Sequence, residues 1–364
     1  LEVEVGSDAK LARPSLIAFF RDRDHTRGNL LVSVLVLALP SILTTTFSFG
    51  VFQLVELSFL GRLGEHALAA AGSSDQVLRQ GLMLFVMGMT VASQMMISRL
   101  VGSGQVEGAE HVAGQSFVLG AGLALVAALT GGLFPEALVR LIASDPEVIS
   151  LATVYVRIVF LSFFVMISGQ IFSTVLNGAG DATTPMLTSV IVTPVSIFSQ
   201  WALTFGHAGL PAIGIAGIPA GAAIGGACGA AVSLYMLFSG RCRVHLRARH
   251  VVPDLPTLGR ILTTSLMPAA HMLARSLMVM FFMIMAGRLG GKVQAAYTVG
   301  LRLEMLAIML AFPIANACAT LVGQNLGAGE PGRAEASVWR IGWYNMVFTL
   351  AVSVVFFLFH DRLV

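Results

Sequence analysis

The sequence is dominated by long apolar segments, each about as long as the roughly twenty-residue helix that crosses ~30 Å of hydrocarbon. Nine such segments can be delimited, at about residues 34–59, 76–100, 115–141, 151–176, 184–205, 212–238, 258–287, 296–322 and 335–359. Their runs do not alternate between apolar and polar residues, which excludes a transmembrane β-barrel. The sequence therefore predicts an all-α polytopic membrane protein with about nine spans.

The chain has too few charged side chains to cover a water-soluble surface. Hydrophobic residues make up 56% of the 364 and charged residues 11%, against about 25% charged residues in soluble domains. This composition excludes a soluble enzyme, a disordered chain, a collagen and a disulfide scaffold. The net charge of +3 does not indicate a nucleic-acid partner, because the arginines lie between apolar segments, as expected for orientation in a membrane.

The distribution of basic residues predicts how the chain is oriented. With the amino terminus inside, most arginines face the cytoplasm, including those of the segment from Arg241 to His250. The outside then receives only Arg62, Arg140, Arg288, Lys292 and Arg362. We therefore expect a multi-pass protein of the inner (plasma) membrane with a cytoplasmic amino terminus.

An internal repeat divides the chain into two lobes. The string GRLG occurs at residues 61–64 and again at 287–290, and the loop GSGQVEGAE at 102–110 resembles GAGEPGRAE at 327–335. Matching glycines in loops, at a nearly constant separation of about 226 residues, favour a duplication over chance similarity between apolar helices. Both copies begin on the same side of the membrane, so the repeat is parallel.

The repeat and the basic segment predict four parts of the chain. They are a cytoplasmic tail at 1–30, a first six-helix lobe at 31–240, a basic cytoplasmic linker at 241–257 and a partial second lobe of three helices at 258–364. The expected fold is a two-lobe pseudo-symmetric helix bundle with six plus three spans. Because the second lobe has half the spans of the first, we expect a truncated sequence rather than a natural short form.

Four segments resemble the multidrug and toxic compound extrusion (MATE) family. They are LALPS at 37–41, VELSFLGRLGEHALAAAG at 55–72, LNGAGDATTPM at 176–186 and ATLVGQNLGAGEPGRAE at 319–335. The resemblance covers roughly residues 30–345 and implies two six-helix lobes around a central cavity, of which this sequence lacks the last three helices. It also implies export of organic cations and drugs by alternating access, driven by inward flow of sodium or protons.

Glu56 lies in the first span, where a charged side chain is costly and therefore informative. Helical spacing places Gln53, Thr45 and Ser41 near its face, and a desolvated carboxylate can exchange a proton or bind a dehydrated cation. The resemblance implies that Glu56 occupies the position of an acid, usually aspartate, in family members. We expect it to couple transport to a cation; the alternative is an interfacial glutamate paired with Arg62.

The fifth span carries a polar stripe with a spacing of three or four residues, formed by Ser189, Thr193, Ser196, Gln200 and Thr204. Facing lipid, these groups would lack partners, so the stripe is expected to face a wet cavity or another helix. The resemblance implies that Gln200 replaces an aspartate, which would make one cation ligand neutral; hydrogen bonding between helices is an equal alternative. The fourth span adds polar residues at similar spacing, namely Gln170, Thr174 and Asn177.

The seventh span places Pro268, His271 and Arg275 on one helical face. Histidine is the side chain that titrates nearest physiological pH. Glu304 in the eighth span is the natural partner of Arg275, with Arg302 competing for it. We expect a structural ion pair here; the alternative is a second coupling site formed by His271 and Glu304.

Together these features predict a secondary active antiporter that exports amphiphilic or cationic organic compounds in exchange for inward Na⁺ or H⁺. No motif for ATP binding or catalysis occurs in the sequence, so we expect no enzyme activity and no cofactor besides the coupling ion. The expected partners are a small organic substrate and membrane lipid, with a monomeric state. The alternatives are a flippase for a lipid-linked saccharide, which would need basic side chains in the cavity, and a non-transporting membrane fragment.

Overall fold

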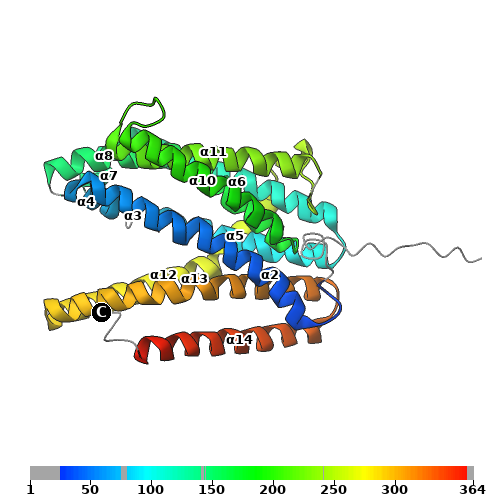
Figure 1. The fold of residues 1–364 in the computed structure, drawn as a ribbon. Helices are drawn as coiled ribbons and strands as arrows, with labels where there is room; N and C mark the ends of the chain where they lie inside the picture. The colour runs from blue at the N-terminus through cyan, green and yellow to red at the C-terminus, as the bar shows by residue number, and fades with distance from the viewer. Residues whose placement is uncertain (1–24, 75–79, 141–142, 144, 241, 359–364) are drawn as a thin grey trace, which may run out of the picture.

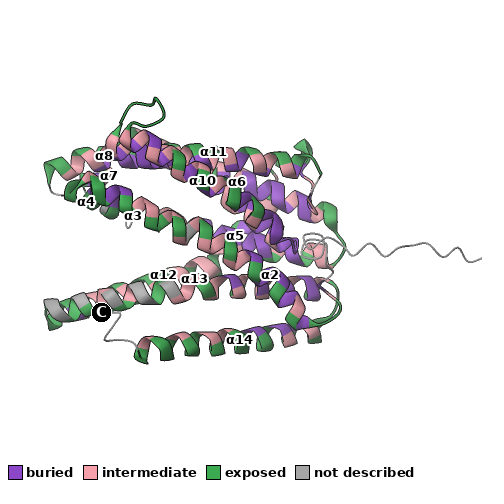
Figure 2. Cartoon of the chain, in the orientation of Figure 1, coloured by how far each residue is buried: buried purple, intermediate pink, exposed green. Residues whose placement is uncertain are grey.

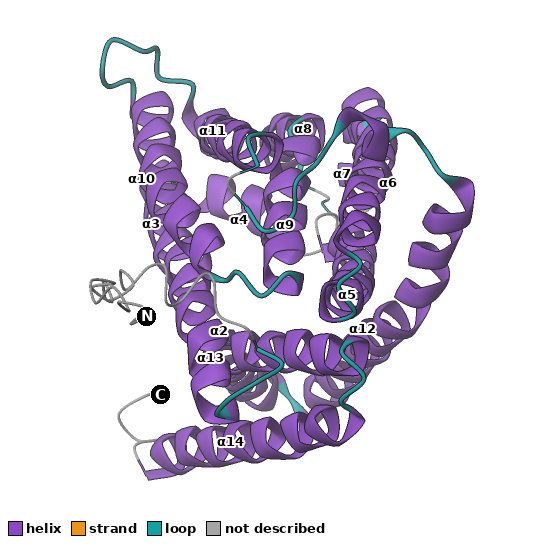
Figure 3. Cartoon of the chain, turned by 90° about the vertical axis from the view of Figure 1, so that its right-hand side faces the viewer, coloured by secondary structure: helices purple, strands orange, loops and turns teal. Residues whose placement is uncertain are grey.

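The computed structural model describes residues 25–358 except 75–79, 141–142, 144 and 241. Most of the expected amino-terminal tail, residues 1–24, lies outside the described residues. Helices and the loops between them make up the described part of the chain, in which no strand is present (Figure 3). The predicted all-α fold is therefore confirmed.

The helices follow the apolar segments of the sequence (Figure 1). Up to residue 240 they are α2 (Leu30–Thr45), the π-helix η1 (Thr46–Val51), α3 (Phe52–Leu63), α4 (Glu65–Ser74), α5 (Gln80–Gly102), α6 (Val106–Leu133), α7 (Pro135–Arg140), α8 (Pro146–Leu161), α9 (Phe163–Gly178), α10 (Thr183–Phe205), the 3₁₀ turn η3 (Gly214–Ala216) and α11 (Gly217–Phe238). After residue 240 they are the 3₁₀ turn η4 (Ala248–Val251), α12 (Leu255–Leu289), α13 (Gly291–Gly327) and α14 (Pro331–Leu358).

Eight helical segments of the described residues are long and apolar enough to cross a membrane, and the bent pair α8–α9 makes a ninth. Counted in this way, the number agrees with the nine predicted spans, but the third lies at Val106–Leu133 and not at the predicted 115–141. The first of them runs through α2, η1 and α3 without interruption, from Leu30 to Leu63.

The first span contains a π-helical segment that its apolar pattern does not predict. Pro40 lies inside α2 and lacks the backbone donor of an ordinary helical residue. The hydroxyls of Ser41 and Thr45 donate to the carbonyls of Leu37 and Ser41, four residues earlier in each case, a pattern that bends helices. The π turn η1 follows at once. Because a π turn holds about one extra residue, it rotates α3 relative to α2 by roughly 100°.

The fourth span is bent by 48° between α8 and α9, where the sequence predicts one straight helix. Neither proline nor glycine lies at the bend. Instead, the Ser162 hydroxyl donates to the carbonyl of Ile158 at 2.7 Å and also lies 3.2 Å from the carbonyl of Val159. Serine that bonds back to its own helix in this way is a recognised cause of kinks.

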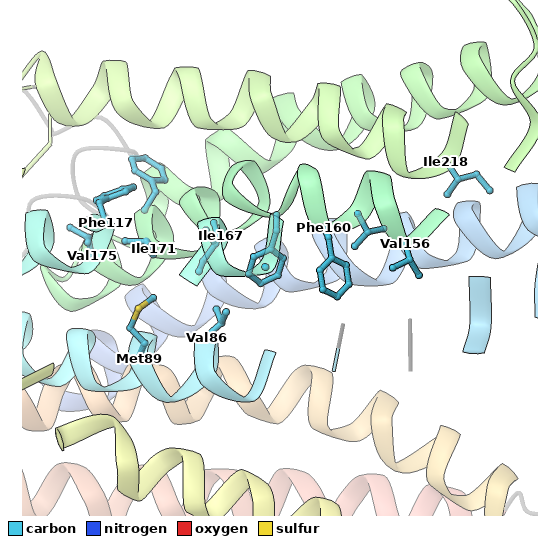
Figure 4. Packing of buried hydrophobic residues seen from close by; sticks show 14 of the residues in the cluster. Val86, Met89, Phe117, Val156, Phe160, Ile167, Ile171, Val175 and Ile218 are labelled. Atoms are coloured by element: carbon cyan, nitrogen blue, oxygen red, sulfur yellow. The ribbon is translucent and has the colours of Figure 1, made fainter. Parts of the chain in front are cut away.

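The core of the first lobe lies between α5, α6, α8, α9 and α11. Figure 4 shows Val86 and Met89 of α5 facing Ile167 and Ile171 of α9, with further buried side chains from the neighbouring helices. The second lobe differs, because α12 and α14 present mostly exposed residues while buried residues concentrate in the first lobe (Figure 2). These two helices therefore have large faces without protein contact in this structure.

Helices α10 and α11 pack through a row of glycines. A Cβ atom at Gly221 would overlap the backbone of Gln200, and one at Gly225 would overlap Ser196. The same holds one turn earlier for Gly217 against the backbone of Thr204. Small residues repeated at every fourth position let two membrane helices approach to backbone contact, and this brings the polar stripe of α10 directly against α11.

This seam makes a testable prediction about stability. Gly221→Ala should lower the free energy of unfolding by about 1–3 kcal/mol, because the added methyl overpacks a backbone contact. Thermal unfolding of the detergent-solubilised protein measures the effect. Gly169→Ala in α9 is the matched control, since a Cβ there meets no atom within 4 Å. Equal melting temperatures for the two variants would contradict the close packing.

The two lobes meet through a contact that repeats the internal symmetry. A Cβ at Gly102, the last residue of α5, would overlap the backbone of Gln324 in α13. Conversely, a Cβ at Gly327, the last residue of α13, would overlap the backbone carbonyl of Arg99 in α5. Gly102 and Gly327 begin the two matching loops of the repeat, so each copy offers its glycine to the helix of the other copy.

The carboxyl end of α9 is held by two side chains of α13. The Thr320 hydroxyl donates to the carbonyl of Asn177 at 2.9 Å, and the Gln324 amide donates to the carbonyl of Gly178 at 3.1 Å. Thr320 in turn accepts a hydrogen bond from the buried amide of Gln94 in α5, at 3.0 Å. These bonds join the first lobe to the second.

Two more carbonyls of the same helix end are bonded from other parts of the chain. A guanidinium nitrogen of Arg243, in the linker, donates to the carbonyl of Ala179 at 3.1 Å. The His25 ring nitrogen Nε2 lies 3.3 Å from the carbonyl of Gly180. The last carbonyls of a helix lack the partner that the next turn would supply. Here four consecutive carbonyls at and just beyond the end of α9, from 177 to 180, are bonded by α13, the linker and the segment before α2, and that of Asn177 also accepts from the Gly180 amide at 3.0 Å. We call this arrangement the inter-lobe lock.

Removing the α13 side chains of the lock should loosen it. The double variant Thr320→Val with Gln324→Ala should cost about 1–3 kcal/mol of stability, because buried carbonyls lose their donors. Hydrogen exchange of the 176–182 peptide should become faster. Ser337→Ala is the control, since the Ser337 hydroxyl donates within α14 to the carbonyl of Arg333. Unchanged exchange in the double variant would show that these bonds do not hold the helix end.

Candidate functional site

Glu56 lies on α3 with its carboxylate directed at the neighbouring helix α8. The Tyr155 hydroxyl donates to Glu56 Oε1 at 3.1 Å. Tyr155 is 3% exposed, and Glu56 is partly buried. An acid within a span thus has a buried phenol as a donor, and hydrogen bonds to charged groups are stronger than neutral ones.

The other polar residues expected near Glu56 are placed differently from what helical spacing suggests. Gln53 is exposed, while the hydroxyls of Ser41 and Thr45 are bonded within α2. The π-helix between α2 and α3 breaks the phase relation that placed Ser41 and Thr45 on the face of Glu56. The alternative partner Arg62 is exposed and forms no described ion pair with Glu56.

Gln200 is completely buried on α10 against the glycine row of α11. Neither its Oε1 nor its Nε2 atom has a hydrogen-bond partner, and the same is true of the nearby Thr204 hydroxyl. A buried amide without partners costs free energy. The middle part of the polar stripe therefore faces another helix and not a wet cavity. The amide of Gln200 nevertheless makes no hydrogen bond to that helix, so neither of the two expected roles of the stripe is fully met here.

The other polar residues predicted to line the cavity in the first lobe lie on α9 and α10. Ser196 is buried and donates to the carbonyl of Val192 in its own helix at 3.0 Å. Gln170 and Asn177 are partly buried on α9, and the Asn177 carbonyl belongs to the inter-lobe lock. Asn177 therefore joins the contact between the lobes through its backbone.

An apolar pocket of about 580 Å³ lies between the first span and α10. Four aromatic rings line it, together with Val51 of the π-helix and Thr193 of the polar stripe; the rings are Phe47, Phe59, Phe198 and Trp201. Ligand pockets have this size and are lined mainly by apolar and aromatic side chains with few polar groups. Of the polar residues expected to line a cavity, Thr193 is the one that contributes to this pocket.

Arg275 of α12 and Glu304 of α13 form the expected ion pair, with Arg275 Nη2 3.0 Å from Glu304 Oε1. His271 is exposed on α12, and the side chain of Arg302 lies outside the described residues. Because Glu304 neutralises Arg275, this guanidinium is not available to bind the pyrophosphate of a lipid-linked saccharide.

Within the described residues, the hydrogen bonds and ion pairs of the predicted coupling residues place Glu56 with Tyr155 and Arg275 with Glu304, while Gln200 lies in the glycine seam. Tyr155 was not anticipated from the sequence. The sequence shows only a tyrosine within the apolar fourth span. It does not indicate the partner of that tyrosine, which lies 99 residues away in the chain. Among the described residues, no group of three or more His, Cys, Asp or Glu side chains could hold a metal ion.

Similar proteins are found along nearly the whole chain. It is 28% identical over 337 residues to the "Probable multidrug resistance protein NorM" of Thermotoga maritima, covering 90% of this chain and 70% of that protein. It is also 25% identical to the "Multidrug resistance protein PmpM" of Pseudomonas aeruginosa, covering 84% and 64%, and 23% identical to the "FAD transporter" of Shewanella oneidensis, covering 89% and 72%.

Solved structures share the fold. One described as an outward-facing conformation of a multidrug resistance MATE family transporter superposes with a TM-score of 0.83 at 23% identity, covering 93% of this chain and 74% of that one. Another, described as a MOP superfamily transporter from Pyrococcus furiosus, gives a TM-score of 0.84 at the same identity and coverage.

The sequence model of the MatE family matches residues 40–202 and 268–364. The two matched segments include both copies of the GRLG repeat. The unmatched residues are 1–39, which include the start of α2, and 203–267, which run from the end of α10 through α11 and the linker into α12. With most of its length matched, this multi-pass membrane protein belongs to the MatE family, whose members are transporters and not enzymes.

Proposed function

We propose that the protein is an antiporter that exports amphiphilic or cationic organic compounds in exchange for inward flow of Na⁺ or H⁺. The observation that carries this proposal is the Glu56 carboxylate, partly buried within a span and bonded to the buried Tyr155 hydroxyl. In such a place the free energy of the bare carboxylate differs strongly from that of its protonated or cation-bound form. The names of the relatives from Thermotoga maritima and Pseudomonas aeruginosa support efflux of drugs as the task.

The aromatic pocket supports the same substrate class. Its four rings favour flat apolar ligands by stacking, and rings attract organic cations through their π faces. The wall is shared by Phe59 of α3, one turn beyond Glu56, and by Thr193 of α10. A substrate in this pocket would therefore lie against the helix that carries the proposed coupling residue.

In this proposal the protein lies in the plasma membrane with its amino terminus in the cytoplasm, as the arginine distribution suggests. The inter-lobe lock would then close the cytoplasmic end, since it includes His25 and the linker residue Arg243. Alternating access would require Thr320 and Gln324 to leave the α9 carbonyls. We propose a monomer as the working unit.

Glu56→Gln should abolish gradient-driven efflux while leaving expression intact, because the amide cannot exchange a proton and binds cations poorly. Tyr155→Phe should lower efflux by about 10- to 150-fold, since a hydrogen bond to a charged group contributes about 1.5–3 kcal/mol. Dye efflux from vesicles is measured with sodium and proton gradients imposed separately, which also identifies the coupling ion. Glu65→Gln, an exposed acid at the start of α4, is the control. Wild-type efflux by Glu56→Gln would remove this carboxylate from the mechanism.

Gln200 allows a test that separates function from stability. Gln200→Met should raise the free energy of unfolding by about 1–3 kcal/mol, because a buried polar group without partners is removed. We expect this cost to be tolerated because the amide binds the coupling cation during transport. The same variant should lose efflux. Thermal unfolding and dye efflux are measured on the same preparation. A variant that is less stable and still transports would instead assign Gln200 a purely structural place in the seam.

A further inference from the structure

The linker between the lobes is rigidly attached to the first lobe. The fully buried amide of Gln115, in α6, donates to the carbonyls of His250 at 2.9 Å and Val252 at 2.7 Å. Its Oε1 atom accepts from the backbone amide of Asp254 at 2.9 Å. A Cβ at Gly114 would overlap the backbone of His250. This part of the linker is therefore a fixed surface and not a loose tether.

Three carboxylates near the linker already have partners. Glu107 pairs with the linker residue Arg249, with Arg249 Nη2 2.6 Å from Glu107 Oε1, and both side chains are exposed. The Glu110 carboxylate accepts from the backbone amide of His245 at 3.1 Å and lies 3.9 Å from the ring of buried His250. Asp254 lies 3.1 Å from His111 Nε2, and the Thr257 hydroxyl together with His111 holds the pKa of Asp254 below its usual value. The carboxylates of Glu110 and Asp254 thus compensate positive and donor groups within the protein.

The outer side of the linker is apolar and basic. Val252 is 63% exposed and Leu255 is 79% exposed, although neither lies in the middle of a span. Arg247 before them and Arg260 after them are exposed, and neither guanidinium has an ion-pair partner among the described residues. We call these four residues the linker patch. Apolar side chains beside unpaired arginines are the composition of a membrane-interface anchor.

The depth of the linker patch agrees with this composition. Helix α6 has 28 residues and is roughly 42 Å long, about 12 Å more than the hydrocarbon core. Because Glu107, Glu110 and His111 lie in its first turns, the extra length is expected at this end, in the headgroup layer, and Gln115 clamps the linker near the boundary. Leu255 also begins the exposed apolar stripe of α12, which continues with Leu262 and Leu266.

From these observations we infer that the linker patch is a binding surface for anionic phospholipid headgroups, with Val252 and Leu255 seated in the membrane interface and Arg247 and Arg260 holding the phosphates. Charge complementarity selects the occupant: two unpaired arginines favour an anionic lipid over a zwitterionic one. Their fixed attachment to α6 means that the first lobe carries this lipid contact. The inference does not depend on which compound or ion is transported.

The first experiment measures depth. A spin label is attached at Val252→Cys in a chain whose Cys228, Cys242 and Cys318 are replaced by serine, reconstituted in vesicles of phosphatidylglycerol and phosphatidylcholine. Power saturation should place the label about 5–10 Å inside the headgroup boundary. A label at Gln105→Cys, exposed before α6 at the same end, should remain in water. A label at 252 that is as accessible to aqueous reagent as the control, or shielded from both water and lipid by protein, overturns the inference.

The second experiment measures lipid selectivity. Binding of phosphatidylglycerol and of phosphatidylcholine to the purified full chain is titrated by native mass spectrometry. Arg247→Gln with Arg260→Gln should weaken phosphatidylglycerol binding by about 30-fold, since each arginine near an anionic surface contributes a factor of about five. The lysine double variant should bind like the wild type, and Arg288→Gln, at the opposite end of α12, should have no effect. Equal losses in the glutamine double variant and Arg288→Gln would overturn the inference.

Discussion

The structure depends on one constraint: a polar group that leaves water must find a partner inside the protein. The end of α9 shows how the chain meets it. Four successive carbonyls at and just beyond this end are bonded by Thr320, Gln324, Arg243 and His25, and only that of Asn177 also has a local backbone donor among the described bonds, the amide of Gly180. Because these donors come from three different parts of the chain, satisfying one helix end also joins the lobes, the linker and the first span.

The spans could be predicted because they depend on local sequence, and the ion pair because few charged residues lie within the spans. The length and apolar content of a segment are enough to identify a span. Arg275 and Glu304 are opposite charges in consecutive spans, so their pairing could be expected, although Arg302 was a competing partner from the sequence. The duplication could be read from matching glycines, and Gly102 with Gly327 shows the reason that they match: both end a helix at the same reciprocal crossing.

The details of the candidate site could not be predicted, and each has a physical reason. The π-helix arises from the combined effect of Pro40 and hydroxyl back-bonding, which no periodicity reveals. Tyr155 meets Glu56 across 99 residues, and without a known fold no spacing rule connects them. The lock uses backbone carbonyls as acceptors, which leave no trace in the side-chain pattern.

The bent fourth span connects the two regions on which the proposed transport cycle depends. Tyr155 lies on α8 and bonds Glu56, while the lock forms at the end of α9, and the two helices join at the kink of Ser162. A change at Glu56 therefore acts on the same kinked element that the second lobe holds at its other end.

The strength of the lock is compatible with such a cycle. Two side-chain bonds from α13 to α9 and two from Gln94, to Thr320 and to the carbonyl of Asn316, cross between the lobes. At the usual net value of a hydrogen bond these four contribute about 2–6 kcal/mol in total. Reversing a two-state population from 1:99 to 99:1 needs about 5.5 kcal/mol of differential binding. One elementary charge moving through 100 mV supplies about 2.3 kcal/mol. In the proposed cycle, a coupling ion and a substrate together would supply enough free energy to break these bonds.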